Sequence, residues 1–164
     1  MRIKLHAFSM GLAVAISCAS SPPALAQSVT DIYNHDNMYR SSGAHTYDRH
    51  VNISLDAVES RVTTGGLRCA SKYSSLQEAN SKISELLYQW EWAIDDNWVK
   101  YAAMGSTNIY RYENRPNYGW VYVRGAGWYY GNATALVVKK VPTTVRAKGW
   151  IVLTSYPDIK GTCY

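Results

Sequence analysis

The chain has 164 residues, of which 17 are basic and 12 acidic, so its formal net charge is +5 with the histidines neutral. This length suffices for one hydrophobic core and is too short for two ordinary domains, and no repeat or low-complexity tract indicates a fibrous or disordered protein. The mild positive charge permits a basic groove for a polyanion without requiring one.

Residues 1–26 have the pattern of a cleaved export signal. Arg2 and Lys4 form a basic start, residues 7–16 are uncharged and mostly apolar, and residues 24–26 are Ala-Leu-Ala, which suits a cleavage site. The apolar run is shorter than the roughly 20 residues of a membrane-spanning helix. We expect a mature chain that begins at Gln27, has no membrane anchor and acts in the periplasm or outside the cell.

Removal of this segment leaves 15 basic and 12 acidic residues, a net charge of +3, and two cysteines, Cys69 and Cys163. An even cysteine count in an exported protein predicts a disulfide, with two free thiols as the alternative. A lipid attached at Cys18 is a second alternative, which is disfavoured because Ala15 stands where a larger aliphatic residue is usual.

The mature chain begins with polar residues and continues with helical patterns. Residues 27–42 lack periodicity, which indicates a flexible N-terminal arm before a folded domain at 43–164. Ser54 can cap a short helix that carries Arg61 and ends at Gly65-Gly66. Ser75 and Glu78 form a capping-box pattern for a second helix, whose apolar stripe extends toward Ala102.

After Gly105 the pattern changes to alternating Tyr, Val, Trp and Thr in short runs between Gly, Pro and Asn, which is typical of strands. Helices followed by strands predict an α+β domain with an antiparallel sheet. The expected strands are 108–112, 120–124, 134–141 and 150–156, with turns at 115–117, 125–127, 131–132 and Pro142.

Two segments carry groups that can move protons or bind an anion. His45 and His50 are five residues apart, a spacing that turns the rings apart on an α-helix and to opposite faces on a strand, so it does not predict a close pair. Thr154 and Tyr156 share one face of an expected strand and can together bind a phosphate. Cleavage of RNA without a metal needs a base, which a histidine can supply, together with a cation and a proton donor.

The chain from about 43 to 158 resembles the bacterial ribonuclease A-like domain at the C-termini of contact-dependent growth-inhibition toxins. The resemblance rests on motifs at both ends and in the middle of this region. They are Gly43-Ala-His45 with Arg49-His50-Val51, Arg61 eleven residues after His50, Ser71-Lys72-Tyr73, and Val152-Leu153-Thr154-Ser155-Tyr156-Pro157.

The resemblance implies a ribonuclease A-like fold with a curved antiparallel sheet, and a catalytic set of His50, Arg61, Thr154 and Tyr156. It implies an RNA substrate, in several members transfer RNA, with no metal or cofactor and a 2′,3′-cyclic phosphate product. The second acid or base stays open between Tyr156, His45 and Lys139. A cognate immunity protein is a candidate partner, and we expect a monomer.

This chain departs from the family in being short, with its own export signal, which leaves its delivery open. Two other functions compete with a ribonuclease toxin. Metal-dependent hydrolysis fits poorly, because no carboxylate and histidine cluster has metal-ligand spacing. The other is a catalytically inactive secreted binding protein on the same scaffold.

Overall fold

The computed structural model describes residues 31–113 and 119–163. The export signal, the first residues of the expected arm and the expected turn at 115–117 lie outside the described residues. The described elements follow in chain order: α1 (Ile32–Tyr39), η1 (Arg40–Ser42), η2 (Tyr47–Val51), α2 (Leu55–Thr63), β1 (Cys69–Tyr73), α3 (Leu76–Ala93), η3 (Ile94–Trp98), α4 (Val99–Tyr101), β2 (Thr107–Glu113), β3 (Gly119–Val123), β4 (Gly127–Tyr130), β5 (Ala133–Lys140) and β6 (Trp150–Asp158).

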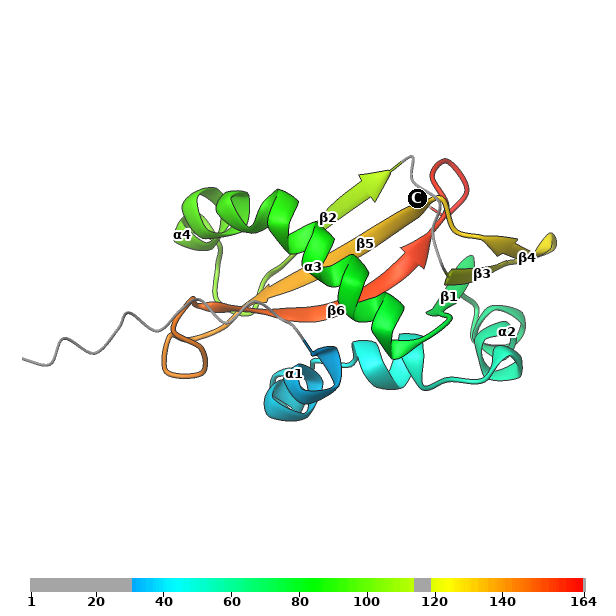
Figure 1. Ribbon diagram of the computed structural model, residues 1–164, viewed down its shortest axis with the longest axis horizontal. Coiled ribbons are helices and arrows are strands. Elements are labelled where there is room, and N and C mark those ends of the chain that lie inside the picture. Colours follow the sequence, from blue (N-terminus) through cyan, green and yellow to red (C-terminus); the bar gives the residue numbers. More distant parts are fainter. Residues whose placement is uncertain (1–30, 114–118, 164) are drawn as a thin grey trace, which may run out of the picture.

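The strands of the described residues form two three-stranded antiparallel sheets, in the orders β1-β3-β4 and β2-β5-β6, with the helices in the N-terminal part of the chain (Figure 1). The predicted α+β class is therefore confirmed. Two strands were not predicted. β1 is short and contains Ser71 and Lys72 without a clear alternation, and β4 has only four residues between glycine-containing turns. Each becomes a strand because β3 supplies its hydrogen-bonding partner.

Helix α3 crosses the β2-β5-β6 sheet and covers one of its faces (Figure 1). The Ser75 hydroxyl accepts a hydrogen bond from the Glu78 amide at 3.1 Å, which confirms the predicted cap. Ile83 and Leu86 of α3 pack with Leu136 and Trp150 of the sheet in the main core. The helical path continues through the π-helical turn η3 and α4 to Tyr101, close to its predicted end.

The two sheets meet where β1 and β3 approach β6. The Tyr73 hydroxyl and the Ser155 hydroxyl are 2.7 Å apart in the buried interior, and each comes from a different sheet. At Gly119 of β3 a Cβ atom would lie 2.1 Å from a side-chain carbon of Pro157, so only glycine permits this approach. This junction brings the start of β3 against the end of β6.

The prediction of a flexible N-terminal arm at residues 27–42 is wrong for the part that the structure describes, because residues 32–39 form α1. Asp31 caps the helix, and Ile32 is fully buried in the main core beside α3. The polar composition of α1 gives no apolar stripe from which a helix could be predicted. Ile32 supplies its main hydrophobic contact, and buried Asp36 accepts a hydrogen bond from the Tyr47 amide at 2.6 Å. The folded domain therefore begins before Gly43.

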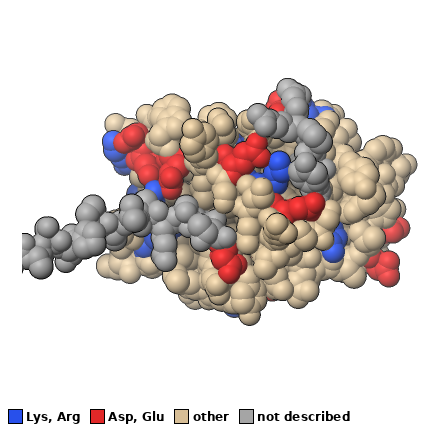
Figure 2. All heavy atoms as spheres, in the orientation of Figure 1, with Lys and Arg blue, Asp and Glu red and all other residues tan. Residues whose placement is uncertain are grey.

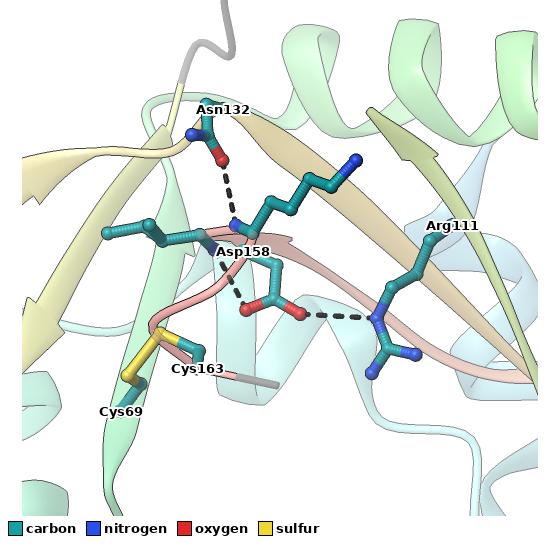
Figure 3. The surroundings of a disulfide bond; sticks show 7 residues. Cys69, Arg111, Asn132, Asp158 and Cys163 are labelled. Atoms are coloured by element: carbon teal, nitrogen blue, oxygen red, sulfur yellow. Dashed lines mark hydrogen bonds and ion pairs between the residues drawn. A yellow bond between two sulfur atoms is a disulfide. The ribbon is translucent and has the colours of Figure 1, made fainter. Parts of the chain in front are cut away.

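The predicted disulfide is present. Cys69 at the start of β1 is bonded to Cys163, which ends the turn that follows β6 (Figure 3). The bridge closes a loop with a sequence separation of 94 residues and fastens the C-terminal turn to the β1-β3-β4 sheet. Within 31–113 and 119–163, no helix is both long and apolar enough to cross a bilayer.

Candidate active site

A cavity of about 350 Å³ lies where the two sheets and the segment around η2 and α2 converge. One wall, which we call the histidine wall, carries His45, His50 and Arg61. A second group of lining residues, which we call the strand wall, comes from β2 and β6 and consists of Arg111, Thr154, Tyr156 and Asp158. The lining is completed by Leu67, Arg68, Cys69, Ala70, Ser71, Val121, Pro157 and Cys163.

His50 lies on η2 and is only 6% exposed. Its Nδ1 is 2.9 Å from the Ser71 carbonyl oxygen, which can only accept, so Nδ1 carries the proton in the neutral ring and Nε2 is the acceptor. Burial, followed by the charge of Arg61, lowers the pKa of His50 from 6.5 to about 3, although the Ser71 bond opposes the shift. His50 is therefore a neutral imidazole at neutral pH.

His45 shares the cavity with His50, contrary to the expectation from their spacing. The chain between them turns through the π-helical segment η2, whose wide turn is closed by the Asn52 amide donating to the Tyr47 carbonyl at 2.7 Å. His45 Nδ1 lies 2.6 Å from the Gly43 carbonyl, so the neutral ring also has Nε2 as its acceptor. Two histidines five residues apart therefore line the same cavity in this conformation.

Arg61 extends from α2, as its position in the sequence predicted. Its guanidinium donates to the Arg49 carbonyl oxygen at 3.1 Å. Burial and the nearby charge of Arg49 lower the pKa of Arg61, yet a guanidinium keeps its charge in proteins. The histidine wall thus presents one fixed cation beside two imidazole rings.

Thr154 and Tyr156 lie two residues apart on β6 and both line the cavity, as predicted. The Thr154 hydroxyl is buried and finds no hydrogen-bond partner among the described residues. An unsatisfied buried hydroxyl is costly, and a bound anion would satisfy it. The Tyr156 ring lies 5.2 Å, centre to centre, from the His50 ring, so it links the two walls. Burial, then the charge of Asp158, raises the pKa of Tyr156, which stays protonated.

Sequence reasoning missed Arg111, Asp158 and Arg68 in this cavity. Asp158 continues the two-residue spacing of Thr154 and Tyr156, so the strand pattern could have indicated it. No local sequence pattern indicates Arg111, because β2 is brought near the site only by its pairing with β5, which in turn pairs with β6. Three arginines and one carboxylate among the described lining residues make the cavity basic.

The acidic residues Glu91, Asp95 and Asp96 lie elsewhere, at the end of α3 and in η3. Figure 2 shows acidic side chains gathered over this end of the molecule. Glu91 and Asp95 share Lys148, at 2.5 and 3.2 Å. The three arginines of the cavity therefore lie apart from this acidic group, and their positive charge favours an anionic ligand in the cavity.

Lys139, a sequence candidate for the second acid or base, is not among the lining residues. Its ammonium group donates to the Ser42 carbonyl at 2.8 Å, which gives it a structural contact in place of the expected role. Among residues 31–113 and 119–163, no group of three or more His, Cys, Asp and Glu side chains could hold a metal ion.

An α+β domain with two antiparallel sheets and a basic cavity holding histidine, arginine and hydroxyl groups has the features of a ribonuclease A-like domain. The chain belongs to the family of bacterial CdiA-CT RNAse A domains, which it matches over residues 44–157. Its fold is similar to that in the crystal structure of a CdiA-CT/CdiI complex from Y. kristensenii, with a TM-score of 0.60 and 23% identity, covering 70% of this chain and 98% of that one. No curated protein sequence matches this chain.

Proposed function

We propose that this protein is an exported, metal-independent endoribonuclease that acts as an antibacterial toxin or effector. The observation that carries the proposal is the single basic cavity in which His50, Arg61, Thr154 and Tyr156 meet, with the unpartnered Thr154 hydroxyl on its wall. These groups supply a base, a cation and hydroxyl donors, the set that phosphodiester transesterification requires. The family match supports ribonuclease chemistry.

His50 is the proposed base. Its Nε2 lone pair accepts the proton of the ribose 2′-hydroxyl while the 2′-oxygen forms a bond to phosphorus. The low pKa of the free site, which burial and the charges of Arg61, His45 and Arg49 produce, makes His50 a weak base. A bound phosphate carries negative charge that offsets the nearby cations, so substrate binding raises the pKa of His50 toward the useful range.

Arg61 and the strand wall are the proposed phosphate ligands. Arg61 balances the negative charge that grows on the phosphorane, and the hydroxyls of Thr154 and Tyr156 donate to its oxygens. Both hydroxyls project from one rigid strand, so their separation changes little during the reaction. The bond from phosphorus to the 5′-oxygen then breaks, leaving a 2′,3′-cyclic phosphate.

His45 is the proposed acid for the departing 5′-oxygen. It lines the same cavity, and its Nδ1 is fixed by the Gly43 carbonyl, so a protonated ring has Nε2 free to donate. Lys139 is a weaker candidate because its ammonium group is occupied by Ser42. Tyr156 is assigned to phosphate binding, because burial raises its pKa, so the hydroxyl keeps its proton and can donate it in a hydrogen bond.

RNA, with transfer RNA as a candidate target, is the proposed substrate, and no cofactor is needed. Export through the signal at residues 1–26 places the mature monomer in the periplasm or outside the cell. A cognate immunity protein is a proposed partner, since the similar structure from Y. kristensenii is a complex of CdiA-CT with CdiI.

The test incubates oxidised protein starting at Gln27 with total RNA in EDTA, beside the His50→Ala and Lys139→Met variants. Wild type and Lys139→Met are expected to cleave RNA and leave cyclic phosphate ends, while His50→Ala leaves it intact. Thermal unfolding of all three proteins checks that they are folded. Intact RNA with folded wild type would reject the ribonuclease and favour a binding protein on this scaffold. Cleavage by His50→Ala would reject the base.

A further inference from the structure

Arg111 reaches the strand wall from two strands away. In the β2-β5-β6 sheet Arg111 is opposite Ala135, and Ala135 is opposite Tyr156, so the three residues form one row on one face. Neighbouring strands are about 4.8 Å apart, and the long Arg111 side chain crosses over β5, because its Nε lies 3.5 Å from Oδ2 of Asp158 on β6. The methyl group of Ala135 leaves this path open, so the guanidinium can lie over β5 and meet Tyr156.

The guanidinium of Arg111 has partners on both sides. Its Nε is 3.5 Å from Oδ2 of Asp158 (Figure 3), and it is hydrogen-bonded to the Tyr156 side chain. Every polar hydrogen of a guanidinium is a donor, and the group has no acceptor. The Tyr156 oxygen must therefore accept from Arg111, and the hydroxyl hydrogen of Tyr156 is left to donate to another acceptor in the cavity.

Asp158 is itself held in place. It is buried, and its Oδ1 accepts from the Ile159 amide at 2.9 Å while Oδ2 faces Arg111. The turn that follows is tied down twice: the Lys160 amide donates to Asn132 at 2.9 Å, and Cys163 is bonded to Cys69 (Figure 3). A fixed carboxylate fixes the direction of the guanidinium, because the two groups form an ion pair.

We propose that Arg111, held by Asp158, is a positioning residue that makes the Tyr156 hydroxyl a hydrogen-bond donor directed at the phosphate of the substrate. The inference rests on the proposed function for the identity of that phosphate. It assigns Arg111 an effect that passes through Tyr156, in contrast to Arg61, whose guanidinium contacts the substrate directly in the proposed reaction.

The test is a double-mutant cycle with Arg111→Met, Tyr156→Phe and the double variant, read as kcat on RNA. Each single change is expected to lower kcat about tenfold, the loss of one hydrogen bond to a charged group, and the double variant is expected to be no worse than Tyr156→Phe. Multiplying losses, about a hundredfold in the double variant, would overturn the proposal, because Arg111 would then act without Tyr156.

A second readout separates this inference from the proposed function. The same cycle is measured as affinity for a dinucleotide that lacks the 2′-hydroxyl and cannot be cleaved, so it reports even if wild type leaves RNA intact. The double variant is again expected to bind no more weakly than Tyr156→Phe. Losses in affinity that multiply in the double variant would reject the positioning role. Arg124→Met is the matched control, since Arg124 is exposed and does not line the cavity. Arg111→Lys, which keeps a charge opposite Asp158, replaces Arg111→Met if that variant does not fold.

Discussion

The two walls of the cavity hold their polar groups in different ways. On the histidine wall, His45, His50 and Arg61 each bond to a backbone carbonyl, those of Gly43, Ser71 and Arg49. On the strand wall, Tyr156 has a side-chain partner in Arg111, and the Thr154 hydroxyl has no partner among the described residues.

This difference suits two tasks. A carbonyl only accepts hydrogen bonds, so it determines which imidazole nitrogen carries the proton and leaves the other to exchange one with substrate. A hydroxyl hydrogen on the strand wall can rotate toward a phosphate oxygen and donate a hydrogen bond to it. We therefore expect proton transfer on the histidine wall and phosphate binding on the strand wall, and variants on the two walls should differ in kind as well as in size.

The largest effect that sharpens this comparison is expected for His45→Ala. Loss of the acid should lower kcat on RNA by on the order of a hundredfold to ten-thousandfold. A uridine 3′-aryl phosphodiester has a leaving group that needs no proton, so its cleavage should fall by less than about tenfold in the same variant. Equal losses on both substrates would show that His45 does not protonate the leaving oxygen.

Thr154→Val should have a smaller effect that both substrates share. Removing a hydroxyl that donates to a charged phosphate costs about 1.5–3 kcal/mol, roughly a tenfold to hundredfold loss in kcat/KM. Thr154→Ser should recover most of it, because the hydroxyl is kept. Thr107→Val is the matched control, an exposed threonine at the start of β2. A loss confined to RNA would place Thr154 in proton transfer and break the comparison.

Asp36→Ala tests how the histidine wall is supported from α1. The buried Asp36 carboxylate accepts from the Tyr47 amide at the start of η2, so its removal should lower the free energy of unfolding by about 1–3 kcal/mol. Asp48→Ala, which removes the exposed pair with Arg40, should cost at most about 1 kcal/mol. Urea titrations measure both, and equal values would show that α1 does not brace this wall.

The pH dependence of stability tests the histidine wall through a slope in place of a single loss. The folded pKa of His50 is lowered to about 3 from 6.5, chiefly by burial, so between these values the unfolded chain binds a proton that the folded protein does not. Stability that is present above pH 6.5 is therefore lost as the pH falls, by up to about 1.4 kcal/mol per pH unit. His50→Gln should show a correspondingly shallower slope in denaturation at several pH values. Parallel slopes would mean that His50 is not neutral and buried.

Much of the molecule follows from local sequence. The caps Ser54 and Ser75 and the apolar stripe of α3 determine their helices, because a side-chain oxygen satisfies a free amide and a 3.6-residue period defines a face. The period of two along β6 places Thr154 and Tyr156 on one side without knowledge of the partner strands. An even cysteine count was enough to predict the bridge that the structure contains.

Tertiary structure decided the rest. α1 is polar, and it is stabilised by buried Ile32 and by the Asp36 carboxylate, which accepts a hydrogen bond from the first residue of η2. The periodicity of the local sequence does not indicate these contacts. His45 and His50 line one cavity, although their spacing separates them on regular elements. Arg111 enters the site through the register of three strands. Sequence determines which face of an element a side chain occupies, whereas pairing and packing between distant segments determine what that face meets.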